Sequence, residues 1–102
     1  MNYDVVITSQ AEREAQTNHD WWAANRSAEQ AARWYDAFVA ATLSLRQNPD
    51  RCPPASENGR FPYEIRQINF GAANKPTRRL LYTVGQQEVV ILRVRHLAQQ
   101  EI

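Results

Sequence analysis

The sequence predicts an α+β domain with the element order βααβββ, in which a helical hairpin packs on one face of a small, mostly antiparallel sheet. Three observations predict it. A short apolar run stands near the amino terminus, two capped amphipathic segments follow it directly, and the last third of the chain reads as a β-hairpin. Two consecutive helices cannot shield both faces of a small sheet equally, so we expect the second face to be available for function.

Length and composition indicate one small domain spanning residues 1–102. A chain of 102 residues with 43% hydrophobic residues is large enough to bury a core, and this composition excludes a disordered class. The net charge is only +1, with the excess of arginines in the carboxyl half. Dedicated nucleic-acid binders are usually much more basic, so the charge gives little support to that class.

Cysteine usage and hydropathy limit the chemistry further. Cys52 is the only cysteine, which excludes an internal disulfide and a cysteine-based zinc site. We therefore expect no metal and no small-molecule cofactor. No apolar run approaches the length of a membrane span, and Asp4 near the amino terminus does not fit a secretory signal. We expect a cytoplasmic protein that does not associate with membranes.

The first half of the chain predicts one strand and two helices. Residues 2–8 contain the apolar run of the strand. Ser9 and Ser27 each stand three residues before a Glu or Gln, the capping-box pattern that begins a helix. Only one of the neighbours Trp21 and Trp22 can easily face inward. The second helix should end at Asn48-Pro49 and bury one stripe, made of Ala31, Trp34, Tyr35, Phe38, Thr42 and Leu45.

The second half predicts a loop followed by three strands. Residues 49–62 hold four of the five prolines and should lack regular structure. Residues 63–70 read as a strand whose apolar parity shifts, which predicts a bulge or burial on both faces. After a polar turn, residues 77–84 and 88–96 flank a Gly-Gln-Gln turn, with Val, Leu, Ile and Tyr on both sides. That pattern is typical of a β-hairpin.

The hairpin carries the candidate functional residues. If Gln86 and Gln87 form the loop, Arg79 opposes Val94, and His96 lies one diagonal step away on the same face. Both side chains could then act on one phosphate. A shift of one residue in the pairing would place Arg79 and His96 on opposite faces, so the inference depends on the register.

Two interpretations of these residues stay open. RNA cleavage by attack of its own 2′-hydroxyl needs proton-transfer groups and a cation at the phosphorane, roles that suit His96 and Arg79. The second proton-transfer group could be Glu64 or Glu57. Alternatively, Arg79 pairs with a carboxylate and His96 merely ends the last strand. Further cations, which could bind phosphate or a partner, are Arg66, Arg78, Arg93 and Arg95.

The segment Arg79-Leu-Leu-Tyr-Thr-Val84, followed by a last strand that ends in histidine, resembles the closing hairpin of the RelE/ParE superfamily of bacterial toxins. The opening strand with its helix start, the segment beginning at Ser27, and the exit at Asn48-Pro49 extend the resemblance over nearly the whole chain. The resemblance implies a RelE/ParE-like fold. It also implies that Arg79 and His96 occupy positions used for RNA cleavage in ribosome-dependent RelE-type toxins.

The resemblance implies a toxin of a type II toxin–antitoxin module, which inhibits growth or stabilises a plasmid. Three actions are compatible with it: ParE-like binding to DNA gyrase, RelE-like cleavage of ribosome-bound mRNA, or binding to the antitoxin alone. Lys75 is the only lysine, and the tail after His96 lacks the basic residues of RelE-type nucleases. These departures favour the ParE-like, non-enzymatic action. In every case the implied partner is a cognate antitoxin with a disordered segment that folds on this domain.

Overall fold

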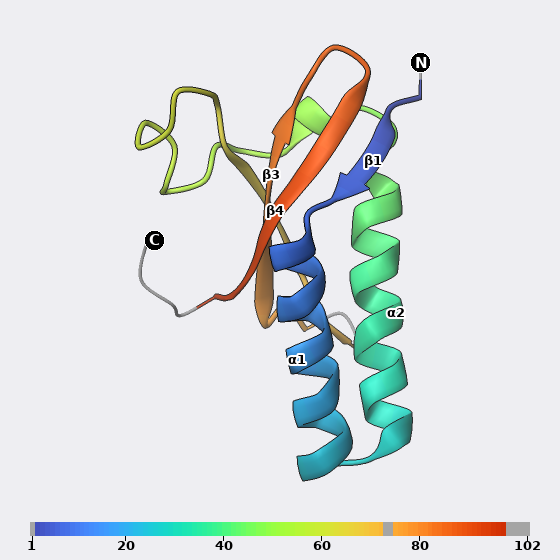
Figure 1. The fold of residues 1–102 in the computed structure, drawn as a ribbon. Coiled ribbons are helices and arrows are strands. Elements are labelled where there is room, and N and C mark those ends of the chain that lie inside the picture. Colours follow the sequence, from blue (N-terminus) through green and yellow to red (C-terminus); the bar gives the residue numbers. More distant parts are fainter. Residues whose placement is uncertain (1, 73–74, 98–102) are drawn as a thin grey trace.

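The computed structural model describes residues 2–72 and 75–97 and confirms the predicted element order (Figure 1). The amino-terminal half contains strand β1 (Asp4–Ile7), helix α1 (Ser9–Asn25) and helix α2 (Ala28–Ser44). A short 3-10 turn, η1 (Pro49–Arg51), follows. The carboxyl-terminal half contains strands β2 (Arg66–Phe70), β3 (Arg78–Val84) and β4 (Glu88–His96).

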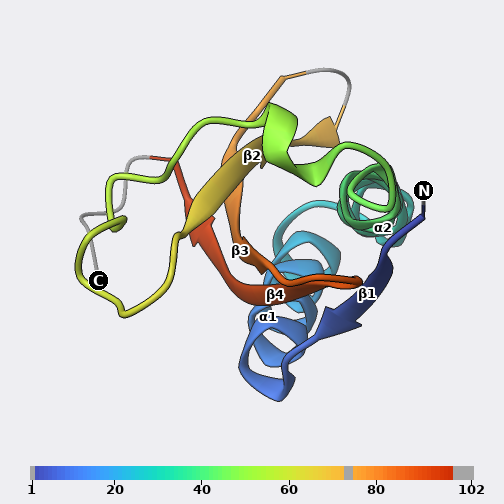
Figure 2. The same cartoon turned by 90° about the horizontal axis from the view of Figure 1, so that it is seen from above.

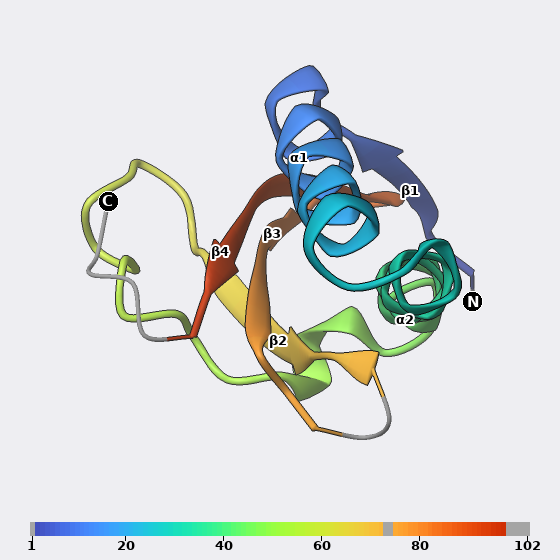
Figure 3. The ribbon, with the colours of Figure 1, turned by 90° about the horizontal axis from the view of Figure 1, so that it is seen from below.

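The four strands form one sheet in the order β1-β4-β3-β2. β1 runs parallel to β4, whereas the β2–β3 and β3–β4 pairs are antiparallel, so the sheet is mixed but mostly antiparallel as predicted. Both helices lie on the same face, and the sheet curves around them (Figures 2 and 3). The helical hairpin extends beyond the end of the sheet, which leaves the far turns of α1 and α2 outside it (Figure 1).

Side-chain caps fix where both helices begin. α2 starts as predicted, because Ser27 Oγ accepts a hydrogen bond from Gln30 N at 3.0 Å. The predicted cap of α1 at Ser9 is wrong by one residue: the N-cap is Thr8, whose Oγ1 accepts from Ala11 N at 3.2 Å. The same hydroxyl donates to the Leu92 carbonyl of β4, at 3.3 Å. Thr8 therefore joins the start of α1 to the sheet.

The main core lies between α2 and the sheet. Trp34 and Phe38 of the predicted stripe are buried and pack with Phe70 of β2, with ring centroids 5.7 to 6.2 Å apart. α1 contributes the fully buried Ala11 and Ala15, whose small side chains let it lie close to the sheet. Trp22 packs against this core, whereas Trp21 is 48% exposed, as predicted for one of the pair.

Tyr82 of β3 anchors the turn that follows α2. Its ring is fully buried, and its hydroxyl donates to the Pro49 carbonyl of η1. Burial raises the pKa of the Tyr82 phenol, because the phenolate would lose its hydration. The neutral Tyr82 phenol therefore donates this hydrogen bond, which stabilises the turn η1 after α2.

Replacing Tyr82 with phenylalanine should lower the free energy of unfolding by about 1 to 2 kcal/mol, because the Pro49 carbonyl loses its donor inside the protein. Urea unfolding followed by circular dichroism measures the change. Tyr63→Phe is the matched control, because Tyr63 is 45% exposed and should lose almost nothing. Equal stability of the two variants would show that the buried hydrogen bond does not stabilise the fold.

A loop covers part of the second sheet face, so this face, which was predicted to be available for function, is open only in part. The segment 53–65 lies across it, on the side of the sheet away from the helices (Figure 2). Buried Ala55, Ile65 and Leu81 form a second small core there, with Phe61 and Leu92 packed against it. Ile65 faces this cluster while Ile68 and Phe70 face the main core, which confirms burial on both faces as the reason for the parity shift.

Candidate functional site

The hairpin turn forms as predicted, but the strand register beyond the turn differs from the predicted one. Gly85 N donates to Glu88 O at 2.7 Å, and Val84 pairs with Val89. A β-bulge then shifts the pairing between Leu81 and Tyr82: Tyr82 faces Ile91 and Leu81 faces Arg93, so Leu92 is the extra residue.

The bulge separates the two residues expected to act together. Arg79 pairs with Arg95, whereas His96 pairs with Arg78. Directly paired residues share a face and successive residues alternate, so Arg79 and His96 lie on opposite faces of the sheet. The predicted juxtaposition of Arg79 and His96 is therefore wrong.

The reason for the bulge is the core. Val89 and Ile91 fill the main core beneath the helices, and strict alternation would bring Arg93 in next. The extra residue Leu92 instead lets Val94 enter that core and turns Arg93 away from it. The sequence contained a signal for this bulge, because the apolar positions change parity between residues 91 and 94.

Arg79 is held in a buried ion pair. Its Nη1 and Nη2 atoms each donate to one carboxylate oxygen of Glu57, both at 2.6 Å, and the two side chains are 5% and 0% exposed. This fork-on-fork geometry is the strongest arrangement of arginine and carboxylate. The alternative interpretation of Arg79, as the partner of a carboxylate, is confirmed, and Glu57 is that carboxylate.

The ion pair controls the protonation of Glu57. Hydrogen bonds from Arg79 lower the pKa of the Glu57 carboxyl to about 2, against the opposing effect of burial. Ser56 Oγ adds a further hydrogen bond at 3.1 Å. A carboxylate with so low a pKa is a poor general base near neutral pH. Glu57 fastens the 53–65 segment to β3.

The other predicted cations do not form one patch. Arg66 binds the carbonyls of Asp50 and Cys52, and its Nε donates to Glu64 at 2.9 Å. Arg93 donates to the Glu14 carboxylate of α1 at 2.9 Å. Arg95 lies opposite Arg79, on the second face. Of the four arginines predicted as phosphate or partner ligands, only Arg78 pairs with His96 across the strands.

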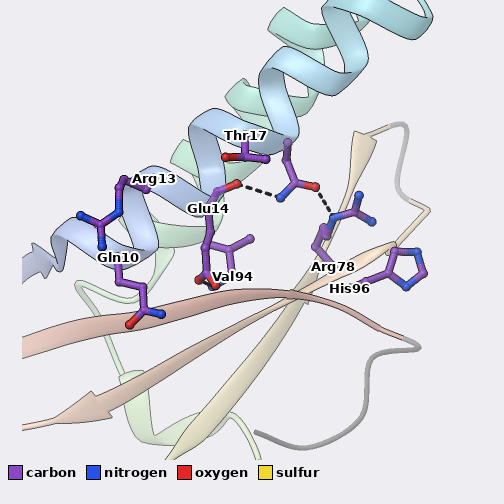
Figure 4. A pocket seen from close by; sticks show the side chains of 8 residues that line it. Gln10, Arg13, Glu14, Thr17, Arg78, Val94 and His96 are labelled. Atoms are coloured by element: carbon purple, nitrogen blue, oxygen red, sulfur yellow. Dashed lines mark hydrogen bonds between the residues drawn. The ribbon is translucent and has the colours of Figure 1, made fainter.

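Arg78 and His96 line a hollow of about 600 Å³ between α1 and the end of β4 (Figure 4). Asn18 of α1 orients Arg78, because its Oδ1 accepts from Arg78 Nε at 2.6 Å. Asn18 in turn donates to the Glu14 carbonyl at 2.8 Å. Asn18 and Arg78 are 60 positions apart, and no local sequence pattern predicts their contact.

Neither a membrane span nor a metal cluster is found in the part of the chain that the structure describes. No helix there is long and apolar enough to cross a bilayer. Likewise, residues 2–72 and 75–97 contain no group of three or more metal-binding side chains.

Comparisons with known proteins assign the family. Residues 5–101 match the family model described as the ParE toxin of the type II toxin–antitoxin system parDE. A solved structure of a chromosomal ParDE toxin–antitoxin system from P. aeruginosa is similar to this chain, with a TM-score of 0.74 and 16% sequence identity. The similarity covers 92% of this chain and 95% of that one, and it shows the fold. None of the curated proteins compared with the chain matches it.

Proposed function

The chain belongs to the ParE toxin family of type II toxin–antitoxin systems, and on that premise we propose that it stops bacterial growth by binding DNA gyrase and does not cleave RNA. The target follows from the ParE-type action that the sequence resemblance implies. The proposal places the protein in the cytoplasm, where gyrase acts.

One observation carries the proposal: the pair required for RelE-like cleavage is not assembled. Arg79 and His96 lie on opposite faces of the sheet, and Arg79 is buried in its bidentate contact with Glu57. An arginine that stabilises a phosphorane must reach the phosphate with free donors. His96 has Arg78 as its neighbour, but the only lysine of the chain lies outside their hollow.

The toxin acts together with a protein antitoxin in this proposal. The family description names a two-component system, and the implied partner is an antitoxin that neutralises this chain by folding on its surface. Neutralisation and gyrase inhibition are separate binding events, so they can be measured separately.

The test compares the wild type with His96→Ala. His96 is exposed at the end of β4, so alanine should leave the fold intact. Each protein is induced in bacteria, and growth, mRNA integrity and plasmid supercoiling are followed. Purified toxin is also added to gyrase in a supercoiling assay. We expect both proteins to arrest growth equally, inhibit supercoiling and leave mRNA intact.

Two results would overturn the proposal. Rapid mRNA cleavage that disappears in His96→Ala would establish a nuclease, with His96 as a catalytic group. Unaffected growth with uninhibited gyrase, in a protein that still binds its antitoxin, would show a toxin that retains only antitoxin binding. Active gyrase without added toxin gives the reference rate for the supercoiling assay.

A further inference from the structure

Arg78 is a partly buried cation that has no carboxylate partner among the residues the structure describes. Within the described part of the chain, the ion pairs of other arginines include Arg79 with Glu57 and Arg93 with Glu14, but none contains Arg78. Its bonds go to neutral oxygens, the Asn18 side chain and the Thr77 carbonyl. Desolvation lowers the pKa of the Arg78 guanidinium, as expected for a cation that burial leaves uncompensated.

Glu14, an acid that lines the hollow, already has partners of its own. Glu14 Oε2 lies 2.8 Å from Arg93 Nη2, and Glu14 Oε1 accepts from the backbone N–H of Val94 at 2.8 Å. This carboxylate satisfies the edge of β4 beyond the end of β1. The Glu14 carboxylate therefore binds the backbone at the sheet edge and the Arg93 side chain. It does not pair with Arg78, although both residues line the same hollow (Figure 4).

An apolar shelf continues the hollow along α1. A second cavity of about 430 Å³ shares Thr17, Asn18, Arg78 and His96 with the first one and reaches Trp21 and Trp22. Trp21 is 48% exposed, and its ring meets that of Trp22 edge to face at 5.4 Å. An oriented arginine beside exposed tryptophan is the composition typical of an interface hot spot.

We propose that Arg78 and the Trp21–Trp22 shelf form the anchor site for an acidic segment of the antitoxin. One Asp or Glu of that segment pairs with the Arg78 guanidinium, and a neighbouring apolar side chain packs on Trp21. The inference rests on the antitoxin partner of the proposed function and adds the place and chemistry of its docking.

The surroundings favour a peptide over a nucleic acid. A polyanion needs several cations along its track, whereas Arg93 is neutralised by Glu14 and Arg66 by Glu64. The net charge of +1 also gives little long-range attraction. Arg13 also lines the hollow but is exposed, whereas Arg78 is partly desolvated and lies beside aromatic rings. Arg78 therefore suits one carboxylate on an otherwise apolar segment, because such a pair is screened little by solvent.

The first test measures binding of the purified antitoxin encoded beside the toxin gene, by titration calorimetry. Arg78→Gln should weaken binding by about 10- to 100-fold, and Arg78→Lys by less, because lysine keeps the charge but loses the planar fork. Arg33→Gln is the matched control, because Arg33 lies exposed on α2 in a surface ion pair with Glu29. It should bind like the wild type.

The second test uses Asn18→Asp, which supplies the missing carboxylate from within the toxin. The new group would stand 2.6 Å from Arg78 Nε and compete with the antitoxin for it. We expect weaker antitoxin binding, by about 10-fold or more. The melting temperature of the toxin should change little, because the new ion pair with Arg78 offsets the loss of the hydrogen bond that Asn18 donates to the Glu14 carbonyl. If Arg78 had a purely structural role, Arg78→Gln would instead have a lower melting temperature and bind the antitoxin with the affinity of the wild type.

Three outcomes would overturn the inference. Arg78→Gln could bind the antitoxin as tightly as the wild type, or Arg33→Gln could lose as much antitoxin affinity as Arg78→Gln. The third is that Arg78→Gln loses affinity for a 20-nucleotide RNA and keeps its affinity for the antitoxin. A double-mutant cycle between Arg78→Gln and each acidic residue of the antitoxin should identify one coupled carboxylate. Antitoxin binding is measured without gyrase, so a failure of gyrase inhibition leaves this result unaffected.

Discussion

Replacing Glu57 with glutamine will lower the free energy of unfolding by about 3 to 5 kcal/mol, because it leaves the Arg79 charge buried and unpaired. The stability of a domain of this size is about 5 to 15 kcal/mol, so the variant will be marginal. Urea unfolding measures the loss. The 53–65 segment should also open, and trypsin should cut after Arg60 faster than in the wild type.

The control for charge removal is Glu29→Gln, whose pair with Arg33 is 77% and 62% exposed and should contribute less than about 1 kcal/mol. A second variant, Glu57→Leu with Arg79→Met, removes both charges and should recover most of the stability. If Glu57→Gln were no less stable than Glu29→Gln, the buried pair would not hold the loop to the sheet.

The pH dependence of stability gives an independent readout of the same pair. The pKa of Glu57 falls from 4.5 to about 2 on folding, so the pair stabilises the protein above the unfolded pKa. That stabilisation, about 3 kcal/mol by the size of the shift, is lost as the pH falls from about 5 through 2. Glu57→Gln should flatten this part of the stability profile.

Replacing Trp34 with alanine will have an effect of similar size, a loss of about 3 to 5 kcal/mol in the free energy of unfolding. Trp34 is fully buried, stacks on Phe38 with an interplanar angle of 3°, and contacts Phe70 of β2. Alanine would leave a cavity where α2 meets the sheet. The midpoint of urea unfolding measures the loss.

Two matched variants test this interpretation. Trp21→Ala removes the same side chain at a position 48% exposed and should change stability by less than about 1 kcal/mol. Trp34→Phe should be milder than alanine, because it keeps an aromatic ring and removes an indole N–H that has no acceptor in the described part of the chain. Equal losses at positions 21 and 34 would contradict a core centred on Trp34.

The Glu57 prediction also bears on function. Opening the 53–65 segment would expose Arg79, yet His96 would remain on the other face of the sheet, because Val94 still fills the main core and keeps the shifted pairing of β3 with β4. We therefore expect mRNA to stay intact even when Arg79 is released. The register and the ion pair are two separate obstacles to RelE-like cleavage.

The sequence by itself determined the elements and their order. The Ser27 cap, the aromatic stripe of α2 and the Gly85 turn are encoded by residues within a few positions of one another, so they can be read locally. The exposure of Trp21 with the partial burial of Trp22 follows from the same short-range periodicity. The family resemblance also rests on such local motifs and their spacing, and the match over residues 5–101 confirms it.

Only the tertiary structure decided which side chains meet. Val94 packs in the main core and Arg93 does not, so Leu92 forms a β-bulge between the two paired parts of β4. The bulge places Arg79 and His96 on opposite faces of the sheet. Glu57 reaches Arg79 across 22 residues, and Asn18 reaches Arg78 across 60. A one-residue slip reverses every face of a strand, and long-range partners depend on how the whole chain closes, so local patterns predicted the strands without predicting the site.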